Sequence, residues 1–508
     1  MRAKIVFGLL LSFFVGFGAL LLLRKRTPHE APPPPRLVAT ATATPDAPDA
    51  PAGSSSAAAG STPAGSALPA ADAGPPDAGD AGDAGADGGA PRAARKLMGR
   101  PLRVAALGWD LLAPALIEND GLDPGEKSGF NAAGLDVRLS AASDMAGVEK
   151  ALARGGADEG GADVAVVPLP AFVASYERLR ALDPEVFLVV GFSRGREAIV
   201  SRKDALPEPN AKDVKLAGLA GDPPTFLALF VLELAGVPAA SVRLVPPQDA
   251  ASATLAAVVR GAAPADARPL LTSADTPRLI PYVAVAPRGL VEAQREALVA
   301  LGRGWLAGSA KLAADPPAGA RRVAAAAGSS DSLAFVARLG ETAPASLTDN
   351  ARMAGLSGRE ALTLEALHQR SWAIWRGVGT LATPAPERSP IVTEIIAALA
   401  LDEAGSSEPT PPTVKLPEGW DKARPLLVQR QEKLDEGALV ATAGLLAATF
   451  ERAVVRVAVL RGGAVDAPRT KRAIEAVVGR FDVSGARVVA ASKPAGKGAA
   501  TLEVLAAP

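Results

Sequence analysis

The stretch Leu102-Arg-Val-Ala-Ala-Leu107-Gly108-Trp109-Asp110 decides the fold class of this chain. It opens with an apolar run of strand length, Gly108 ends the run, and a helix is expected over residues 111–118. The same pattern recurs along the chain, with strands predicted at 135–139, 164–167 and 186–190 and a helix over 145–153. Strands that alternate with helices predict an α/β domain with a mostly parallel sheet.

A second set of alternating elements follows, with strands expected at 214–219, 242–245 and 280–285 and helices at 226–234, 250–260 and 290–306. The segment Gly221-Asp-Pro-Pro-Thr-Phe226 is typical of a helix start, because proline suits the first turn. Free backbone N–H groups at such a start can bind an anion. An ordinary helix start without a ligand is the alternative.

Several polar or aromatic residues lie just past predicted strand ends, namely Trp109, Asp110, Pro168 and Ser193. Ligands of open α/β sheets bind at the carboxyl ends of the strands. These positions are therefore candidates for a binding site.

Composition excludes several classes of function. The 508 residues carry 54 Lys+Arg and 54 Asp+Glu, so the chain has no net charge and lacks the basic field expected of a nucleic-acid binder. There is no cysteine, and the 2 histidines, His29 and His368, lie far apart in the sequence. Disulfides and thiolate metal sites are excluded, and neither a metal nor a cofactor is expected.

The N-terminal region predicts a membrane anchor followed by a linker. Residues 5–23 carry no charge and are long enough to span a bilayer, and Arg24-Lys25-Arg26 follows directly. We expect an uncleaved single-pass anchor over 1–26, with a long signal peptide as the alternative. Residues 27–96 are rich in Pro, Ala and Gly and are predicted to be a disordered linker.

The region after residue 97 resembles the periplasmic solute-binding proteins of ABC importers for nitrate, sulfonate and taurine. The resemblance rests on short segments in a fixed order: Leu102 to Trp109, Gly191-Phe-Ser-Arg-Gly195, Gly221-Asp-Pro-Pro-Thr-Phe226, Gly304-Trp-Leu-Ala-Gly308, Leu347-Thr-Asp-Asn-Ala-Arg-Met353 and the helix 364–377. It is more specifically similar to membrane-anchored forms that end in an OmpA-type domain. It covers about residues 100–508.

This resemblance implies a type II fold of two α/β lobes over 97–402, with the first lobe at about 101–195 and 282–400 and the second at about 196–281. Hinge closure on a ligand between the lobes is implied. The implied ligand-binding residues are Trp109, Ser193, Arg194, Pro224 and Thr225, with Arg194 and Thr225 contacting an anionic group. A surface arginine, a helix-start residue and a packing tryptophan are the alternatives. The resemblance implies a loop and a helix after the 250–260 segment, and in this sequence they are shortened or lost.

The C-terminal region is separated by a second linker at 403–413. Helices are predicted at 434–450 and 469–481, and strands at 454–460, 486–490 and 501–505. Residues 414–508 resemble an OmpA-type domain, which implies peptidoglycan binding through Arg472. The loop 461–466 is shorter than in that family and lacks its usual aspartate, although Asp466 is nearby. A retained fold with a lost site is the alternative.

Together these expectations describe a protein of the cytoplasmic membrane whose soluble part lies in the periplasm. It would capture a small anion for an ABC permease and contact peptidoglycan. One alternative is a structural or sensory envelope protein with degenerate sites. A second is a serine hydrolase, because Gly191-Phe-Ser-Arg-Gly195 matches the nucleophile elbow, with Ser193 as nucleophile and His368 as the only downstream histidine.

Overall fold

The structure is a computed structural model, and it describes residues 95–203, 205–264, 266–356, 358–402, 419–420, 423–493 and 495–505. The predicted anchor, almost all of the first linker and the whole of the second linker lie outside these residues. None of the helices in the described part of the chain is both long enough and apolar enough for a membrane span.

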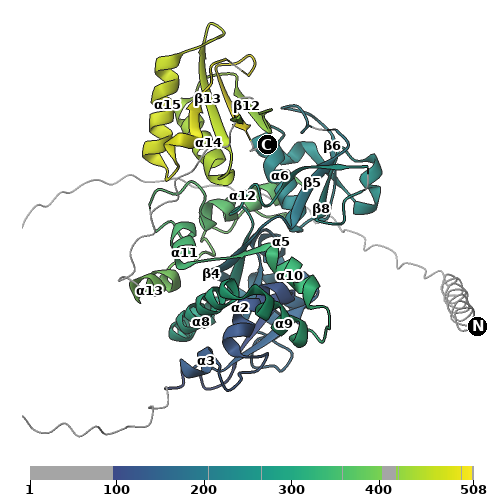
Figure 1. The fold of residues 1–508 in the computed structure, drawn as a ribbon, viewed down its shortest axis with the longest axis vertical. Coiled ribbons are helices and arrows are strands. Elements are labelled where there is room, and N and C mark those ends of the chain that lie inside the picture. The colour runs from purple at the N-terminus through teal and green to yellow at the C-terminus, as the bar shows by residue number, and fades with distance from the viewer. Residues whose placement is uncertain are drawn as a thin grey trace, which may run out of the picture. The chain divides into compact units, whose positions relative to one another are not determined.

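The first lobe, which Figure 1 shows around β4, α2 and α8, is built on a mixed six-stranded sheet. The strand order is β11-β4-β10-β3-β1-β2. Strands β1, β2 and β3 are parallel, and β10 is antiparallel to both β3 and β4. The strands are β1 (Leu102–Leu107), β2 (Val137–Ala142), β3 (Val164–Pro168), β4 (Pro184–Ser193), β10 (Pro281–Pro287) and β11 (Thr342–Pro344).

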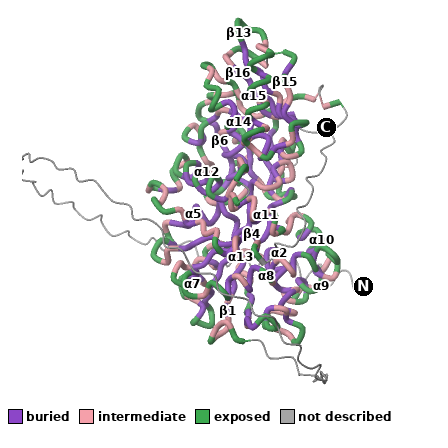
Figure 2. The backbone as a smooth tube through the Cα atoms, turned by 90° about the vertical axis from the view of Figure 1, so that its left-hand side faces the viewer, coloured by how far each residue is buried: buried purple, intermediate pink, exposed green. Residues whose placement is uncertain are grey.

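Helices cover both faces of this sheet, which explains why β3 and β4 are apolar at nearly every position. In β3, Val164 and Val166 belong to the core beneath α2, while Ala165 and Val167 belong to the core beneath α5. Figure 2 shows β4, which lies inside this sheet, as buried tube. The helices are α2 (Trp109–Asn119), α3 (Gly129–Ala132), α4 (Met145–Arg154), α5 (Leu169–Leu179), α7 (Arg288–Ala293), α8 (Arg295–Ala314), α9 (Pro316–Ala326), α10 (Ser332–Gly340), α11 (Leu347–Met353), α12 (Leu364–Gly377) and α13 (Glu394–Asp402).

The second lobe carries a five-stranded sheet in the order β7-β6-β8-β5-β9. Strands β7, β6 and β8 are parallel, and β5 is antiparallel to both β8 and β9. Helix α6 (Pro223–Leu234) is buried along most of its length, as its mainly apolar sequence requires. The strands are β5 (Glu197–Ser201), β6 (Val214–Ala217), β7 (Val242–Val245), β8 (Leu255–Val259) and β9 (Arg268–Thr272).

The chain passes between the lobes at residues 194–196, from β4 to β5, and at 273–280, from β9 to β10. These positions agree with the lobe boundaries that were predicted. Helix α12 adds a packed bridge between the lobes. Its Trp375 donates a hydrogen bond to the Pro170 carbonyl of the first lobe at 2.9 Å, and its ring lies 6.2 Å from that of Phe226 in the second lobe.

The C-terminal unit, residues 423–505, has a sheet in the order β12-β16-β13-β14, with β15 paired to β13 in parallel. Its predicted helices and strands are all present, and β12 and β14 are additional strands. The elements are β12 (Leu427–Gln431), α14 (Glu436–Thr449), β13 (Val454–Arg461), β14 (Ala464–Val465), α15 (Ala467–Arg480), β15 (Val488–Ala490) and β16 (Ala500–Leu505).

The predicted helix over 250–260 is wrong. Residues 247–252 form a short 3₁₀ turn, and 255–259 form strand β8 between β6 and β5. Alanine favours a helix locally, but pairing on both sides buries Leu255, Ala256 and Ala257, and this packing overrides the propensity.

Candidate functional site

A buried polar cluster joins the two crossovers between the lobes. The Ser193 hydroxyl, at the end of β4, donates to the Glu197 carboxylate at the start of β5. The Ser273 hydroxyl, just past β9, lies 2.8 Å from that of Ser193 and accepts from the Gly195 backbone N–H at 2.8 Å. Burial raises the pKa of the Glu197 carboxyl. The two crossovers are thus tied to each other by side chains that water does not reach.

An ion pair attaches this cluster to the first lobe. Asp110, in the first turn of α2, is 4 % exposed and pairs with Arg196 of the first crossover. The nearby Tyr282 hydroxyl is buried and has no hydrogen-bond partner among the described residues. A cavity of about 10 Å³ lies between Asp110 and Tyr282, and it is too small for a solute.

The second lobe presents the carboxyl ends of its three parallel strands at the edge reached by the first crossover. After β6 the chain turns at Gly218 and enters α6, whose first turn contains Pro223 and Pro224. Asp222 makes no side-chain capping bond, and the prolines have no N–H group. The Thr225 backbone N–H is therefore the first one that the helix can offer to a ligand.

The Thr225 hydroxyl is an unused hydrogen-bonding group. The residue is 0 % exposed, and its Oγ1 has no hydrogen-bond partner among the described residues. A Cβ atom added to Gly218 would lie 2.4 Å from this oxygen, so only glycine leaves the required space. An unpaired buried hydroxyl is costly unless a ligand pairs it.

Arg260 lies at the same sheet edge and was not identified from the sequence. It follows β8 directly, and β8 is the parallel neighbour of β6. Its backbone N–H donates to the Arg196 carbonyl at 2.6 Å, and the position of a Cβ on Gly195 is 4.0 Å from its guanidinium. The side chain is exposed and makes no ion pair with a described residue. The wrong helix prediction for 250–260 hid this placement.

The other residues predicted for the site are placed as follows. Trp109 is the first residue of α2 and lies half-buried against the first-lobe core. Pro224 is buried in the first turn of α6. Arg194 is exposed and donates two hydrogen bonds to the Gly340 carbonyl at 3.0 and 3.1 Å, so its guanidinium is held on α10 of the first lobe.

The pairing that a serine hydrolase needs is not formed. Ser193 bonds to Glu197 and Ser273, whereas both ring nitrogens of His368 are buried without a hydrogen-bond partner in the described part of the chain. His368 lies within α12 and packs beside Trp372, and burial lowers its pKa to about 4. No cluster of three or more metal-ligating side chains occurs among the described residues.

In the C-terminal unit, Arg472 is exposed on α15. Asp466 caps the same helix, because its carboxylate accepts from the Arg469 backbone N–H at 3.1 Å. Its carboxylate therefore already has a structural role at the start of this helix.

The chain matches no protein-family model and no curated protein. Solved structures with which it shares a likeness include a putative sulfonate-binding protein SsuA from Methylobacillus flagellatus, at 13 % identity and a TM-score of 0.42, covering 62 % of this chain and 99 % of that one. A second is the aliphatic sulphonate-binding SsuA of Escherichia coli, at 13 % identity and a TM-score of 0.38, covering 57 % of this chain and 94 % of that one. A third is the nitrate-binding NrtA of Synechocystis, at 14 % identity and a TM-score of 0.31, covering 44 % of this chain and 65 % of that one. All three are described as periplasmic.

Proposed function

We propose that this chain captures a small anion between its two lobes and delivers it to an ABC-type importer. One observation carries the proposal: among the described residues the buried hydroxyl of Thr225, at the start of α6, has no hydrogen-bond partner, and Arg260, which follows the neighbouring parallel strand, has no ion-pair partner. Both groups are donors, and both lie at the sheet edge where α/β folds bind ligands.

The chemistry of these donors selects an oxyanion. The Thr225 hydroxyl and backbone N–H supply two hydrogen bonds, and the helix dipole adds a partial positive charge at the same place. The Arg260 guanidinium contributes a full charge and can bind two oxygens of one group. Nitrate, phosphate and the sulfonate group of taurine all present oxygens in this way.

Movement of the lobes would complete the site. The crossovers at 194–196 and 273–280 are the hinge segments, and Trp109 would close the cleft from the first lobe. The hydrogen bonds among Ser193, Glu197 and Ser273 keep the two crossovers together during such a movement.

Thermal unfolding tests the proposal. Nitrate, phosphate, methanesulfonate and taurine would each be added to the purified chain, and a binding anion should raise the melting temperature in a concentration-dependent way. Thr225→Val and Arg260→Gln should each reduce the shift. Arg243→Gln, at an exposed arginine on β7 of the same lobe, is the matched control and should not. A folded protein that ignores all four anions would refute the proposal.

We also propose that the chain is held in the cytoplasmic membrane through residues 1–26, with its soluble part in the periplasm, and that the C-terminal unit contacts peptidoglycan through Arg472. The exposure of Arg472 on α15 supports this contact. Co-sedimentation with purified peptidoglycan tests it. Arg472→Ala should abolish sedimentation, while Lys471→Ala, at the neighbouring exposed position, should leave it unchanged.

A further inference from the structure

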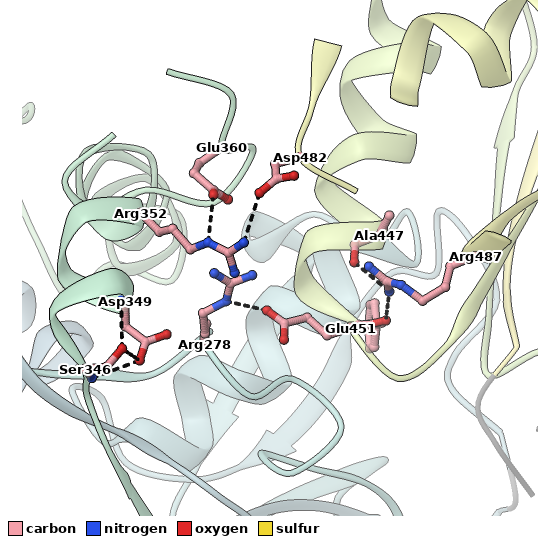
Figure 3. A network of polar contacts seen from close by, with 10 residues as sticks. Arg278, Ser346, Asp349, Arg352, Glu360, Ala447, Glu451, Asp482 and Arg487 are labelled. Atoms are coloured by element: carbon pink, nitrogen blue, oxygen red, sulfur yellow. Dashed lines mark hydrogen bonds and ion pairs between the residues drawn. The ribbon is translucent and has the colours of Figure 1, made fainter. Parts of the chain in front are cut away.

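The C-terminal unit contacts the second crossover between the two lobes, residues 273–280. Arg278, within residues 273–280, pairs with Glu451, which lies between α14 and β13 (Figure 3). Arg278 is only 14 % exposed. A second cation, Arg487, also interacts electrostatically with Glu451. Its guanidinium donates hydrogen bonds to the Ala447 and Phe450 carbonyls, at 3.1 Å each. A hinge segment is thus paired to a carboxylate that the C-terminal unit holds in place.

The same unit is attached to the first lobe through α11 and the loop that follows it. Arg352 of α11 pairs with Asp482 at 3.0 Å and also with Glu360 at 3.4 Å (Figure 3). Arg359 donates to the Val478 carbonyl at 3.0 Å, at the end of α15, and its own carbonyl accepts from the Asp482 N–H at 2.9 Å. A cation at the carboxyl end of a helix is favourable.

Between the C-terminal unit and the second lobe there is a hollow. Its volume is about 580 Å³, and it is lined by residues 205–209 and 269–270 of the second lobe and by 423–428 of the C-terminal unit. The lining includes Pro207, Pro209, Pro269 and Pro425. This side therefore has room for movement, whereas the sides facing the crossover and the first lobe are fixed by ion pairs.

From this asymmetry we infer that the C-terminal unit is a hinge restraint: it is anchored to the first lobe and to the second crossover, and it limits how far the second lobe can swing. The inference rests on the lobe movement about the crossovers that the proposed function includes, but it does not depend on which solute binds. It gives the unit a mechanical role inside this chain, in addition to any partner that it binds.

The test uses interlobe distances in the full chain. The absence of native cysteine allows specific spin labelling. Lys150→Cys on α4 and Lys212→Cys in the second lobe report lobe separation, and Lys150→Cys with Lys433→Cys reports docking of the C-terminal unit. All three lysines are exposed. Arg278→Glu with Arg359→Glu places carboxylates against Glu451 and against the end of α15, so it should undock the unit.

We expect the double variant to lengthen the docking distance and to broaden the interlobe distance distribution or add a second maximum to it. Arg322→Glu, which breaks the Arg322–Asp120 pair within the first lobe, is the control and should change neither distance. An undocked unit with an unchanged interlobe distribution would overturn the inference. An unchanged docking distance in the folded double variant would overturn it too, because these arginines would then not be the anchor.

Discussion

Two residues, Thr225 and His368, are buried polar groups without partners in the described part of the chain, and they differ in what they can do. Thr225 lies at a helix start on a sheet edge, where the proposed anion would pair its hydroxyl. His368 lies inside α12 against Trp372, where only protonation can change it. Thr225 therefore gives a prediction about anion binding, and His368 gives a prediction about the pH dependence of stability.

Thr225→Val should stabilise the unliganded chain and weaken anion binding. The substitution keeps the side-chain shape and removes a buried hydroxyl that lacks a partner, which is worth about 1 kcal/mol. Urea unfolding without anion measures the gain, and calorimetry measures the loss of affinity. Thr225→Ser keeps the hydroxyl and should retain binding. A valine variant that binds as well as the parent would remove Thr225 from the site.

His368 should make stability depend on pH in a defined window. Burial lowers its pKa from 6.5 to about 4, so between these values the unfolded chain takes up a proton that the folded chain does not. Stability is therefore lost as the pH falls from 6.5 to 4, by about 3 kcal/mol at about 1.4 kcal/mol per unit. His368→Leu should lack this component. Parallel stability curves for parent and variant would contradict the assignment.

At the scale of elements, the sequence correctly predicted the helices and strands that have a clear local pattern. It failed where strand pairing determines the secondary structure. Strand β3 is apolar throughout and helix α6 is mainly apolar, and both were found in place. Strand β8 was expected to be helical because Ala is a good helix former, and only its position between β6 and β5 makes it a strand. Arg260 was missed for the same reason. Its place beside the start of α6 follows only once residues 255–259 are known to be a strand that ends at that edge of the sheet.

The packing of α2 on α8 is a contact between elements that depends on one glycine. A Cβ atom on Gly308 would lie 2.0 Å from the Pro114 carbonyl oxygen. Gly308→Ala should therefore force the helices apart and destabilise the chain by about 1–3 kcal/mol. Gly289→Ala in α7, where nothing lies within 4 Å, is the control for the glycine-to-alanine change itself. Equal unfolding free energies for both variants would show that the helices do not need this close approach.

For the whole molecule, the described residues form two lobes and a C-terminal unit, and each has its own sheet built from an alternating pattern of helices and strands. The site is different. Ser193 is hydrogen-bonded inside the crossover cluster and Arg194 to α10, while the side chains of Thr225 and Arg260 have no polar partner in the part of the chain that the structure describes. Sequence spacing could indicate strand ends, but which polar groups remain free depends on contacts between residues distant in sequence.

Titration calorimetry of Arg260→Gln tests the central claim most directly. The anion that gives the largest thermal shift would be titrated into the parent, into Arg260→Gln and into Arg243→Gln. If Arg260 contacts the anion, loss of a charged hydrogen bond worth about 1.5–3 kcal/mol should weaken binding about tenfold or more, with Arg243→Gln unchanged. Equal affinity for all three proteins would contradict anion capture at this edge of the second lobe.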